Sequence, residues 1–175
     1  MKNVIWVLFV SAILFSCQKD ISGTYKALHP TESFEKEIIE IEGNRFTRTF
    51  YGKASDQFHD KSRGKWYYIL CTFPYTMQYQ CSLNKDGDKY TAKLINVDVN
   101  IDKDEFKSSC WQGTNISNDS LIRYYKDYLL DTINGVLDEK KQEYDELGIQ
   151  FVVKENKLIL VGGNEVDDYY IKLVE

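Results

Sequence analysis

A series of short segments in which apolar and polar residues alternate most constrains how this chain can fold. Much of the sequence between residues 34 and 101 follows this pattern, and turn residues such as Gly43-Asn44 and Gly87-Asp88 separate the segments. Successive side chains of a strand point to opposite faces of a sheet, so the alternation is typical of strands with one buried face. Turns at close spacing join such strands into hairpins. The sequence therefore predicts an antiparallel meander.

The predicted strands lie on both sides of one helix. Residues 56–63 and 102–119 are mostly polar, and we expect a loop at each. From Ser120 onward apolar residues recur at helical spacing, which predicts a helix that ends or weakens near Gly135, with the charged residues 138–146 as a candidate continuation. The predicted strands are residues 22–27, 34–41, 45–51, 64–71, 75–83 and 90–101 before the helix, and 149–153, 158–161 and 169–174 after it.

These elements predict a single β-rich domain at residues 23–175. The segments Gly23-Thr24-Tyr25, Gly43-Asn44-Arg45-Phe46 and Gly64-Lys65-Trp66 resemble those of the small lipocalin-like lipoproteins of Bacteroidetes. The resemblance implies a mainly β fold, with an antiparallel meander forming a lipocalin-like barrel. A strongly curved sheet packed by the helix is the alternative, because the helix here precedes the last strands instead of following them.

The N-terminus has the pattern of a secretory signal peptide. Lys2 is followed by an apolar run of about a dozen residues, and the small residue Ser16 precedes Cys17. A membrane-spanning helix needs about 20 residues, so the run is too short to be one. The segment Leu14-Phe15-Ser16-Cys17 resembles a bacterial lipobox. This resemblance implies that residues 1–16 are removed and that a lipid such as palmitate is attached to Cys17.

Residues 17–22 would then form a lipidated tether. The segment Gln18-Lys19-Asp20 resembles the start of the surface-export signal of Bacteroidetes lipoproteins, and an ordinary polar tether is the alternative. We therefore expect a protein held in the outer membrane by the lipid on Cys17. It would face the cell surface if the export signal is genuine and the periplasm if it is not.

Three further cysteines would lie in an oxidising compartment, where disulfides persist. They are Cys71, Cys81 and Cys110, and any two of them can pair. A catalytic cysteine is the functional alternative, but none of them has a histidine beside it in the sequence. We expect either one bridge or inert buried thiols.

No motif identifies an enzyme. Asp98, Asn100 and Asp102 have the spacing of a calcium loop, but Lys103 and Ser109 stand where that loop needs glycine and glutamate. Neither histidine has a second histidine at zinc-binding spacing. We therefore expect no catalytic residue, metal or cofactor. The net charge of −5 is spread along the chain, which argues against a nucleic-acid partner.

Dense aromatic residues are the remaining candidates for binding. One strand face of a barrel lines its interior, so Trp66, Tyr68, Tyr79 and Trp111 are the predicted ligand-binding residues, with core packing as the alternative. We expect a non-enzymatic cell-envelope lipoprotein that binds a small apolar or glycan ligand or a protein partner. An inhibitor or immunity-type lipoprotein that neutralises a toxin or hydrolase is the alternative, and a hydrolase is the third.

Overall fold

The computed structural model describes residues 20–31, 33–62, 65–110, 116–139, 148–161 and 169–174. The predicted signal peptide lies outside these residues, and so do Cys17 and Trp111. The strands within them are β1 (Gly23–Ala27), β2 (Lys36–Glu42), β3 (Arg45–Ser62), β4 (Lys65–Asp86), β5 (Lys89–Ile101), β6 (Lys107–Cys110), β7 (Ile149–Lys154), β8 (Lys157–Leu160) and β9 (Tyr169–Lys172). One helix, α2 (Asn118–Glu139), separates β6 from β7.

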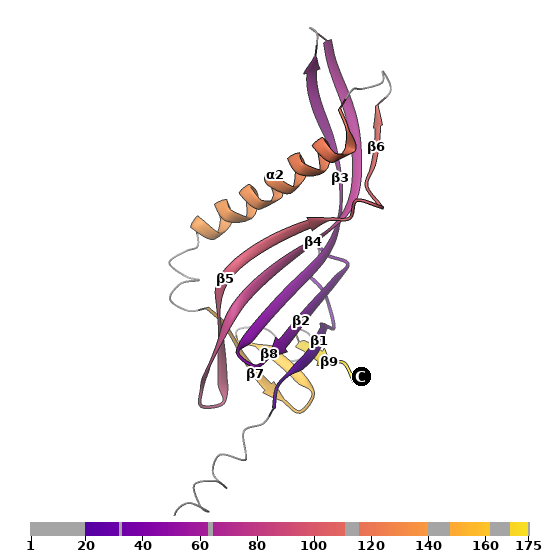
Figure 1. Cartoon of the computed structure of the whole chain (residues 1–175). Helices are drawn as coiled ribbons and strands as arrows, with labels where there is room; N and C mark the ends of the chain where they lie inside the picture. The colour runs from indigo at the N-terminus through magenta and orange to yellow at the C-terminus, as the bar shows by residue number, and fades with distance from the viewer. Residues whose placement is uncertain are drawn as a thin grey trace, which may run out of the picture.

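Eight of these strands form a closed antiparallel barrel (Figure 1). Their order around the ring is β3-β2-β1-β9-β8-β7-β5-β4, and pairing of β3 with β4 closes it. The short strand β6 lies outside the ring and pairs with β4. The prediction of a mainly β barrel with one helix before the last strands is confirmed. Closure removes the open sheet edges of the alternative curved sheet.

The two longest strands continue beyond the barrel as an arm, which consists of residues 53–62 of β3 and 65–74 of β4 (Figure 1). Residues 56–63 were expected to form a loop, and this prediction is wrong for residues 56–62, which pair with β4 throughout. The paired backbone groups are satisfied whatever the side chains are. Because the arm presents much of its surface to water, polar residues are tolerated there and no apolar alternation marks the strand.

A second correction concerns Pro74, where the sequence predicted a break between two strands. Residues 65–86 form the single strand β4. Proline lacks an N–H group, which usually excludes it from a central strand. Here the carbonyl of Pro74 accepts a hydrogen bond from the Asp102 backbone at 3.1 Å, just past the end of β5. Pro74 therefore lies between the parts of β4 that pair with β5 and with β6, where the missing donor leaves no strand partner unsatisfied.

The loop predicted at residues 102–119 is also partly wrong, because residues 107–110 form β6. Three of its four residues are exposed, so the segment carries no apolar alternation that would have indicated a strand. The helix prediction is correct in position, but α2 does not end near Gly135 and continues to Glu139. A single glycine costs a helix only about 1 kcal/mol relative to alanine.

We expect Gly135→Ala to raise the free energy of unfolding by about 0.5 to 1 kcal/mol, because it removes that helix penalty. A Cβ atom added at Gly135 would meet no atom within 4 Å. Gly52→Ala is the matched comparison, since its added Cβ would lie 2.6 Å from the ring of Tyr75. It should destabilise the protein by about 1 to 3 kcal/mol through overpacking. Urea unfolding of both variants measures the change in free energy. Equal changes would contradict the open space at Gly135 and the close contact at Gly52.

The buried apolar residues form two separate cores. The barrel core lies between the barrel strands, and within it the rings of Phe46 and Phe151 are 5.3 Å apart. The arm core lies under the first half of α2, where Phe73 stacks on Phe106 at 5.5 Å and also contacts Tyr125. The first half of the helix is therefore fixed by packing, and the second half extends from it.

A β-bulge in β5 sets which residues of that strand face inward. Cys81 pairs with Leu94 and Gln80 pairs with Asn96, so Ile95 has no partner residue in β4 and is 70% exposed. An extra residue shifts the alternation of a strand by one position. Without it, the polar Asn96 would face inward. The inward residues of β5 are Tyr90, Ala92 and Leu94 before the bulge, and Val97, Val99 and Ile101 after it.

Candidate functional site

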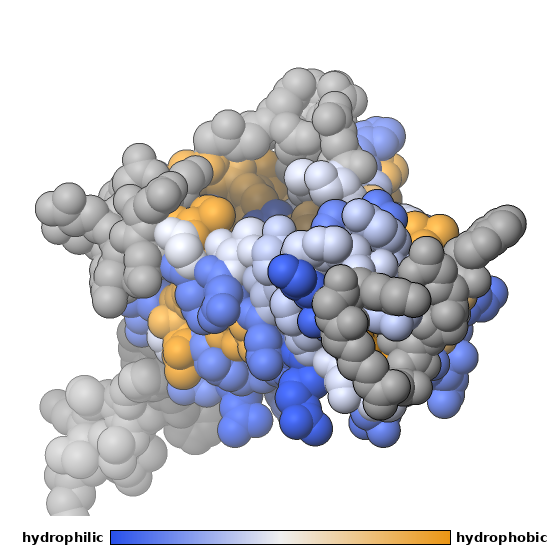
Figure 2. Space-filling view, turned by 90° about the horizontal axis from the view of Figure 1, so that it is seen from above, coloured by the Kyte–Doolittle hydropathy of each residue, from blue (hydrophilic) through white to orange (hydrophobic). Residues whose placement is uncertain are grey.

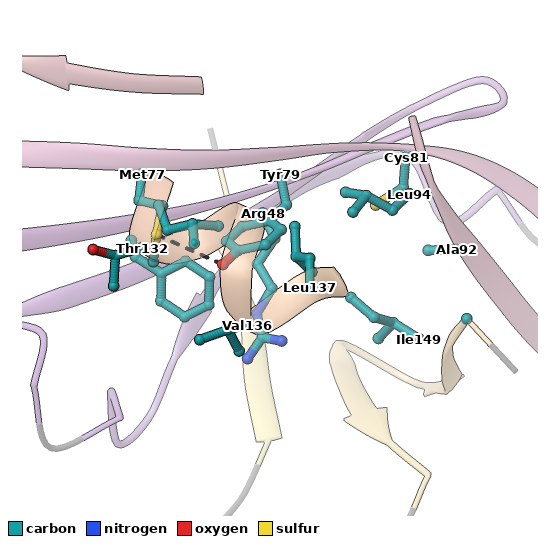
Figure 3. Close-up of a pocket in the computed structure, with 13 residues that line it drawn as sticks. Arg48, Met77, Tyr79, Cys81, Ala92, Leu94, Thr132, Val136, Leu137 and Ile149 are labelled. Atoms are coloured by element: carbon teal, nitrogen blue, oxygen red, sulfur yellow. Dashed lines mark hydrogen bonds between the residues drawn. The ribbon is translucent and has the colours of Figure 1, made fainter. Parts of the chain in front are cut away.

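A cavity of about 310 Å³ lies between the barrel strands and the second half of α2 (Figure 3). This volume is at the lower end of the range for small-molecule sites, which are mostly apolar with a few polar groups. The helix wall of the cavity consists of Thr132, Ile133, Val136 and Leu137. The strand wall consists of Arg48 and Phe50 from β3, Met77, Tyr79 and Cys81 from β4, and Ala92 and Leu94 from β5. Gly148 and Ile149 complete the lining.

The first half of α2 holds the helix wall in place. Ser117 Oγ accepts a hydrogen bond from the Ser120 backbone at 3.2 Å and so caps the start of the helix. Leu121 and Tyr125 are buried in the arm core, and Lys126 pairs with Asp98 of β5 at 3.2 Å. The cavity-lining residues of the helix belong to neither core. Their position over the cavity is therefore set by contacts one or more turns away.

Arg48 is the one charged residue among the described residues that line the cavity. Its Nε donates to Glu37 Oε1 at 2.5 Å, and its Nη2 donates to Tyr170 Oη at 2.9 Å. Tyr170 Oη in turn donates to the same carboxylate oxygen. The Glu37 side chain is 2% exposed and that of Arg48 is 19% exposed. An ion pair with a shared hydroxyl therefore lies at the wall of the cavity, where Arg48 lines it, and Glu37 and Tyr170 line a neighbouring hollow.

The ionisation of this cluster follows from its burial. Burial alone lowers the pKa of Arg48, but Tyr170 and Glu37 favour its charged form, and the net result is a pKa above the ordinary value. Burial is the largest cause of the raised pKa of Tyr170. At neutral pH, Arg48 is thus a cation and Tyr170 a neutral donor.

The four predicted ligand-binding residues do not form one site. Tyr79 lines the cavity, and its Oη donates to Met77 Sδ at 3.6 Å (Figure 3). Trp66 and Tyr68 lie on the arm, with 52% and 51% of their surface exposed. Trp111 lies outside the described residues. The structure therefore supports only Tyr79 as part of the cavity.

Sequence reasoning missed Arg48 and Glu37, although a signal for them existed. Arg48 lies in phase with the buried Phe46 and Phe50 on β3, and Glu37 lies in phase with Ile39 on β2. Two opposite charges at inward positions of neighbouring strands indicate a buried ion pair, because unpaired buried charges are strongly unfavourable. The helix wall carried no such signal, since its pattern is that of any amphipathic helix.

A second surface feature lies on the arm. Trp66, Tyr68 and Leu70 alternate along β4 and are each about half exposed, and we call them the outer stripe. They face away from the arm core, to which the alternate residues of β4 belong. His59 contacts the ring of Tyr68 at 5.0 Å, and Lys61 Nζ lies 5.5 Å from the ring of Trp66. Seen from above, most of the visible surface is hydrophilic, with hydrophobic residues in separate patches and one such patch in a hollow (Figure 2).

The strand register narrows the choice of cysteine pairs. Cys71 and Cys81 lie ten residues apart on β4, which is roughly 33 Å at about 3.3 Å per residue. Cys110 pairs with Ile69, so it lies diagonal to Cys71 on the same face and far from Cys81. The three sulfur atoms are not joined by a disulfide in the structure. Which two cysteines bridge, if any, stays a prediction, but Cys81 is separated from both of the others.

We expect Cys81 to remain a thiol when the protein is oxidised. Burial raises its pKa to about 11, so at pH 8 it is protonated and reacts slowly with alkylating reagents. Any bridge should join Cys71 and Cys110, with a small backbone shift, because diagonal neighbours lie further apart than a disulfide allows. Peptide mapping under non-reducing conditions is the measurement. A Cys81-containing bridge within one chain would show that the strand register is wrong.

The acidic residues with the spacing of a calcium loop make hydrogen bonds and an ion pair within the protein. Asp102 Oδ1 accepts hydrogen bonds from the backbones of Asp104 and Glu105, and Asp98 is paired with Lys126. Within the described ranges, no three His, Cys, Asp or Glu side chains gather as metal ligands would. No helix among the described residues has the length and apolar character needed to cross a membrane.

Comparison of the chain with protein-family models, with curated proteins and with solved structures gives no match. The geometry of the cavity and the sequence itself are therefore the basis for a functional proposal.

Proposed function

We propose that this protein is a non-enzymatic lipoprotein of the cell envelope whose barrel binds a small, mainly apolar molecule in the cavity beneath α2. The observation that carries the proposal is the cavity itself, which has a mainly apolar lining and a volume of about 310 Å³. Removing apolar ligand surface from water supplies the main driving force, at about 25 cal/mol per Å². The proposed outer-membrane anchor rests on the sequence of residues 1–20 alone.

The residues that line the cavity favour ligand binding over catalysis. Among the described lining residues the charged group is Arg48, which is paired with Glu37, and the thiol is Cys81, whose pKa is raised by burial. A nucleophile or general base would need a pKa near the working pH and a partner that activates it. Small apolar ligands of this size bind with modest affinity, because each ligand atom contributes at most about 1.5 kcal/mol and usually less.

We expect Ile133→Trp to weaken the binding of an apolar fluorescent probe, N-phenyl-1-naphthylamine, at least tenfold. The larger side chain would occupy the cavity from the helix wall, to which Ile133 belongs. Asn134→Trp is the matched control, because residue 134 is exposed on the same helix and does not line the cavity. Titration of probe fluorescence measures both. Equal affinity of the two variants would place the probe elsewhere, and no binding by the native protein would refute the proposed function.

A protein partner is the second candidate, and the outer stripe is the observation that favours it. Exposed Trp and Tyr residues beside apolar ones are typical of protein interfaces. Partners recovered from an envelope fraction by the native protein should be lost with Trp66→Ala/Tyr68→Ala and kept with Ile95→Ala, a bulge residue that is also exposed. A toxin or hydrolase among them would favour the inhibitor alternative. Equal recovery by both variants would exclude the stripe.

A further inference from the structure

We infer that the bound molecule carries one neutral hydrogen-bond acceptor, such as a ketone, ester or amide carbonyl, which Arg48 holds while the apolar part fills the rest of the cavity. This inference rests on the proposed function and names the class of ligand. The guanidinium of Arg48, the charged group among the described lining residues, makes hydrogen bonds to the protein with only some of its donors.

Arg48 has more N–H donors than the protein uses. A guanidinium group has five N–H donors in a fixed planar arrangement. Glu37 accepts one of them from Nε and Tyr170 accepts one from Nη2. In the part of the chain that the structure describes, no acceptor engages the other three. The Arg48 side chain is 19% exposed, and its nitrogen atoms are not among the fully buried polar atoms without a partner, so water reaches these donors. A ligand acceptor that takes the place of this water keeps the hydrogen bonds, whereas an apolar group in the same place loses them.

The same contacts hold the guanidinium in one place. Glu37 and Tyr170 fix two edges of its plane, and the ring of Phe50 lies 4.7 Å from its central carbon atom. Figure 3 shows the Arg48 side chain extending among the labelled residues of the cavity. Arg48 also borders a second hollow, which Glu37 and Tyr170 share, so it forms part of the partition between the two. The unused donors are therefore preorganised, and a ligand does not have to order them.

The charge balance favours a neutral acceptor over an anion. Glu37 already neutralises Arg48, and the described residues of the lining include no second cation. A ligand carboxylate would bring a second negative charge near Glu37 and would lose its own hydration among apolar walls. A carbonyl oxygen accepts the same hydrogen bonds without either cost. A purely apolar molecule avoids both costs as well, but where it displaces water from the Arg48 donors it gives no hydrogen bond in return.

Other polar groups of the lining do not compete as the anchor. Thr132 Oγ1 donates to the Tyr128 carbonyl at 2.8 Å, within its own helix. The Tyr79 hydroxyl donates to Met77 Sδ. The Cys81 thiol is a weak donor and is 2% exposed. Among the described lining residues, Arg48 is thus the strongest donor that a ligand in this cavity meets.

The test compares three ligands of equal chain length on the native protein. 2-Decanone, decane and sodium decanoate are titrated at pH 8 against the bound fluorescent probe. We expect 2-decanone to displace the probe at a concentration at least tenfold lower than either decane or decanoate. Decanoate as the best competitor would overturn the inference in favour of an anionic ligand. Equal competition by decane and 2-decanone would overturn it in favour of a cavity without polar selection.

A variant assigns the preference to Arg48. The double change Arg48→Met/Glu37→Leu removes the donors and the carboxylate together, so that no charge is left buried alone. In this variant 2-decanone and decane should displace the probe at about the same concentration. The advantage of 2-decanone should persist in Arg45→Met, an exposed position on the same strand. Persistence in the double variant would remove Arg48 as the anchor. Should the double variant not fold, the ligand series on the native protein still decides, and failure of every ligand and the probe would refute the proposed function instead.

Discussion

A Cys17→Ala variant is expected to lose its membrane attachment completely. The proposed anchor is a lipid on the sulfur of Cys17, and alanine offers no atom to which it can be attached. Each buried CH₂ group of an acyl chain contributes about 0.8 kcal/mol to membrane binding, so removal of the lipid should move the protein to the soluble fraction or leave it unprocessed. Fractionation of cells into membrane and soluble parts, followed by mass measurement of the intact chain, tests this.

Cys110→Ala is the control for that experiment, because it removes a partly exposed cysteine of the folded domain and leaves Cys17 in place. It should partition with the membrane as the native protein does. Unchanged membrane partitioning of Cys17→Ala would refute the lipoprotein proposal. For the native protein, protease treatment of intact cells then separates the two orientations, since only a surface-facing protein is cleaved.

Replacing Glu37 with alanine is expected to lower the free energy of unfolding by about 3 kcal/mol. The change leaves the guanidinium of Arg48 largely buried without its carboxylate, and breaking a buried ion pair from one side typically costs 3–5 kcal/mol. The lower end applies because the Arg48 side chain keeps 19% of its surface exposed and Tyr170 still accepts a hydrogen bond from it. Urea unfolding followed by circular dichroism measures the change.

Glu40→Ala provides the matched control, because Glu40 is an exposed carboxylate on the same strand. It should change stability by less than about 0.5 kcal/mol. The double variant Glu37→Ala/Arg48→Met should recover part of the loss, since it removes the unpaired charge. If Glu37→Ala and Glu40→Ala were equally stable, water in the cavity would be solvating Arg48 and the pair would not be a buried one.

The strands that sequence could predict are those with one face in water and one in a core. β5 alternates in this way on each side of its bulge, and the tight turn at Gly87, where φ is +59°, precedes it. The sequence was misleading in the arm, because residues 56–62 are held by pairing with β4 and not by burial of one face. The single strand through Pro74 was missed because its tolerance depends on where β5 ends and β6 begins. Neither fact is local in the sequence.

The candidate site was predictable only in part. Tyr79 was identified from aromatic density, but the residues that set the chemistry are Arg48 and Glu37, which stand in phase with apolar neighbours on their strands. That phase was readable from the sequence. The cavity itself was not, because its walls come from strands near residues 48 and 79 and from a helix near residue 133. Only the packing of the first half of α2 on the arm brings them together.

The division of labour along α2 has a consequence for how such a protein can diverge. Ile133, Val136 and Leu137 touch the cavity and belong to neither core, whereas Leu121 and Tyr125 are fixed in the arm core. Substitutions in the last turns of the helix can therefore change the size and shape of the accepted molecule with little effect on folding. Descendants of one ancestral chain could keep the same barrel, the same Arg48 anchor and the same arm while binding ligands of different size and shape.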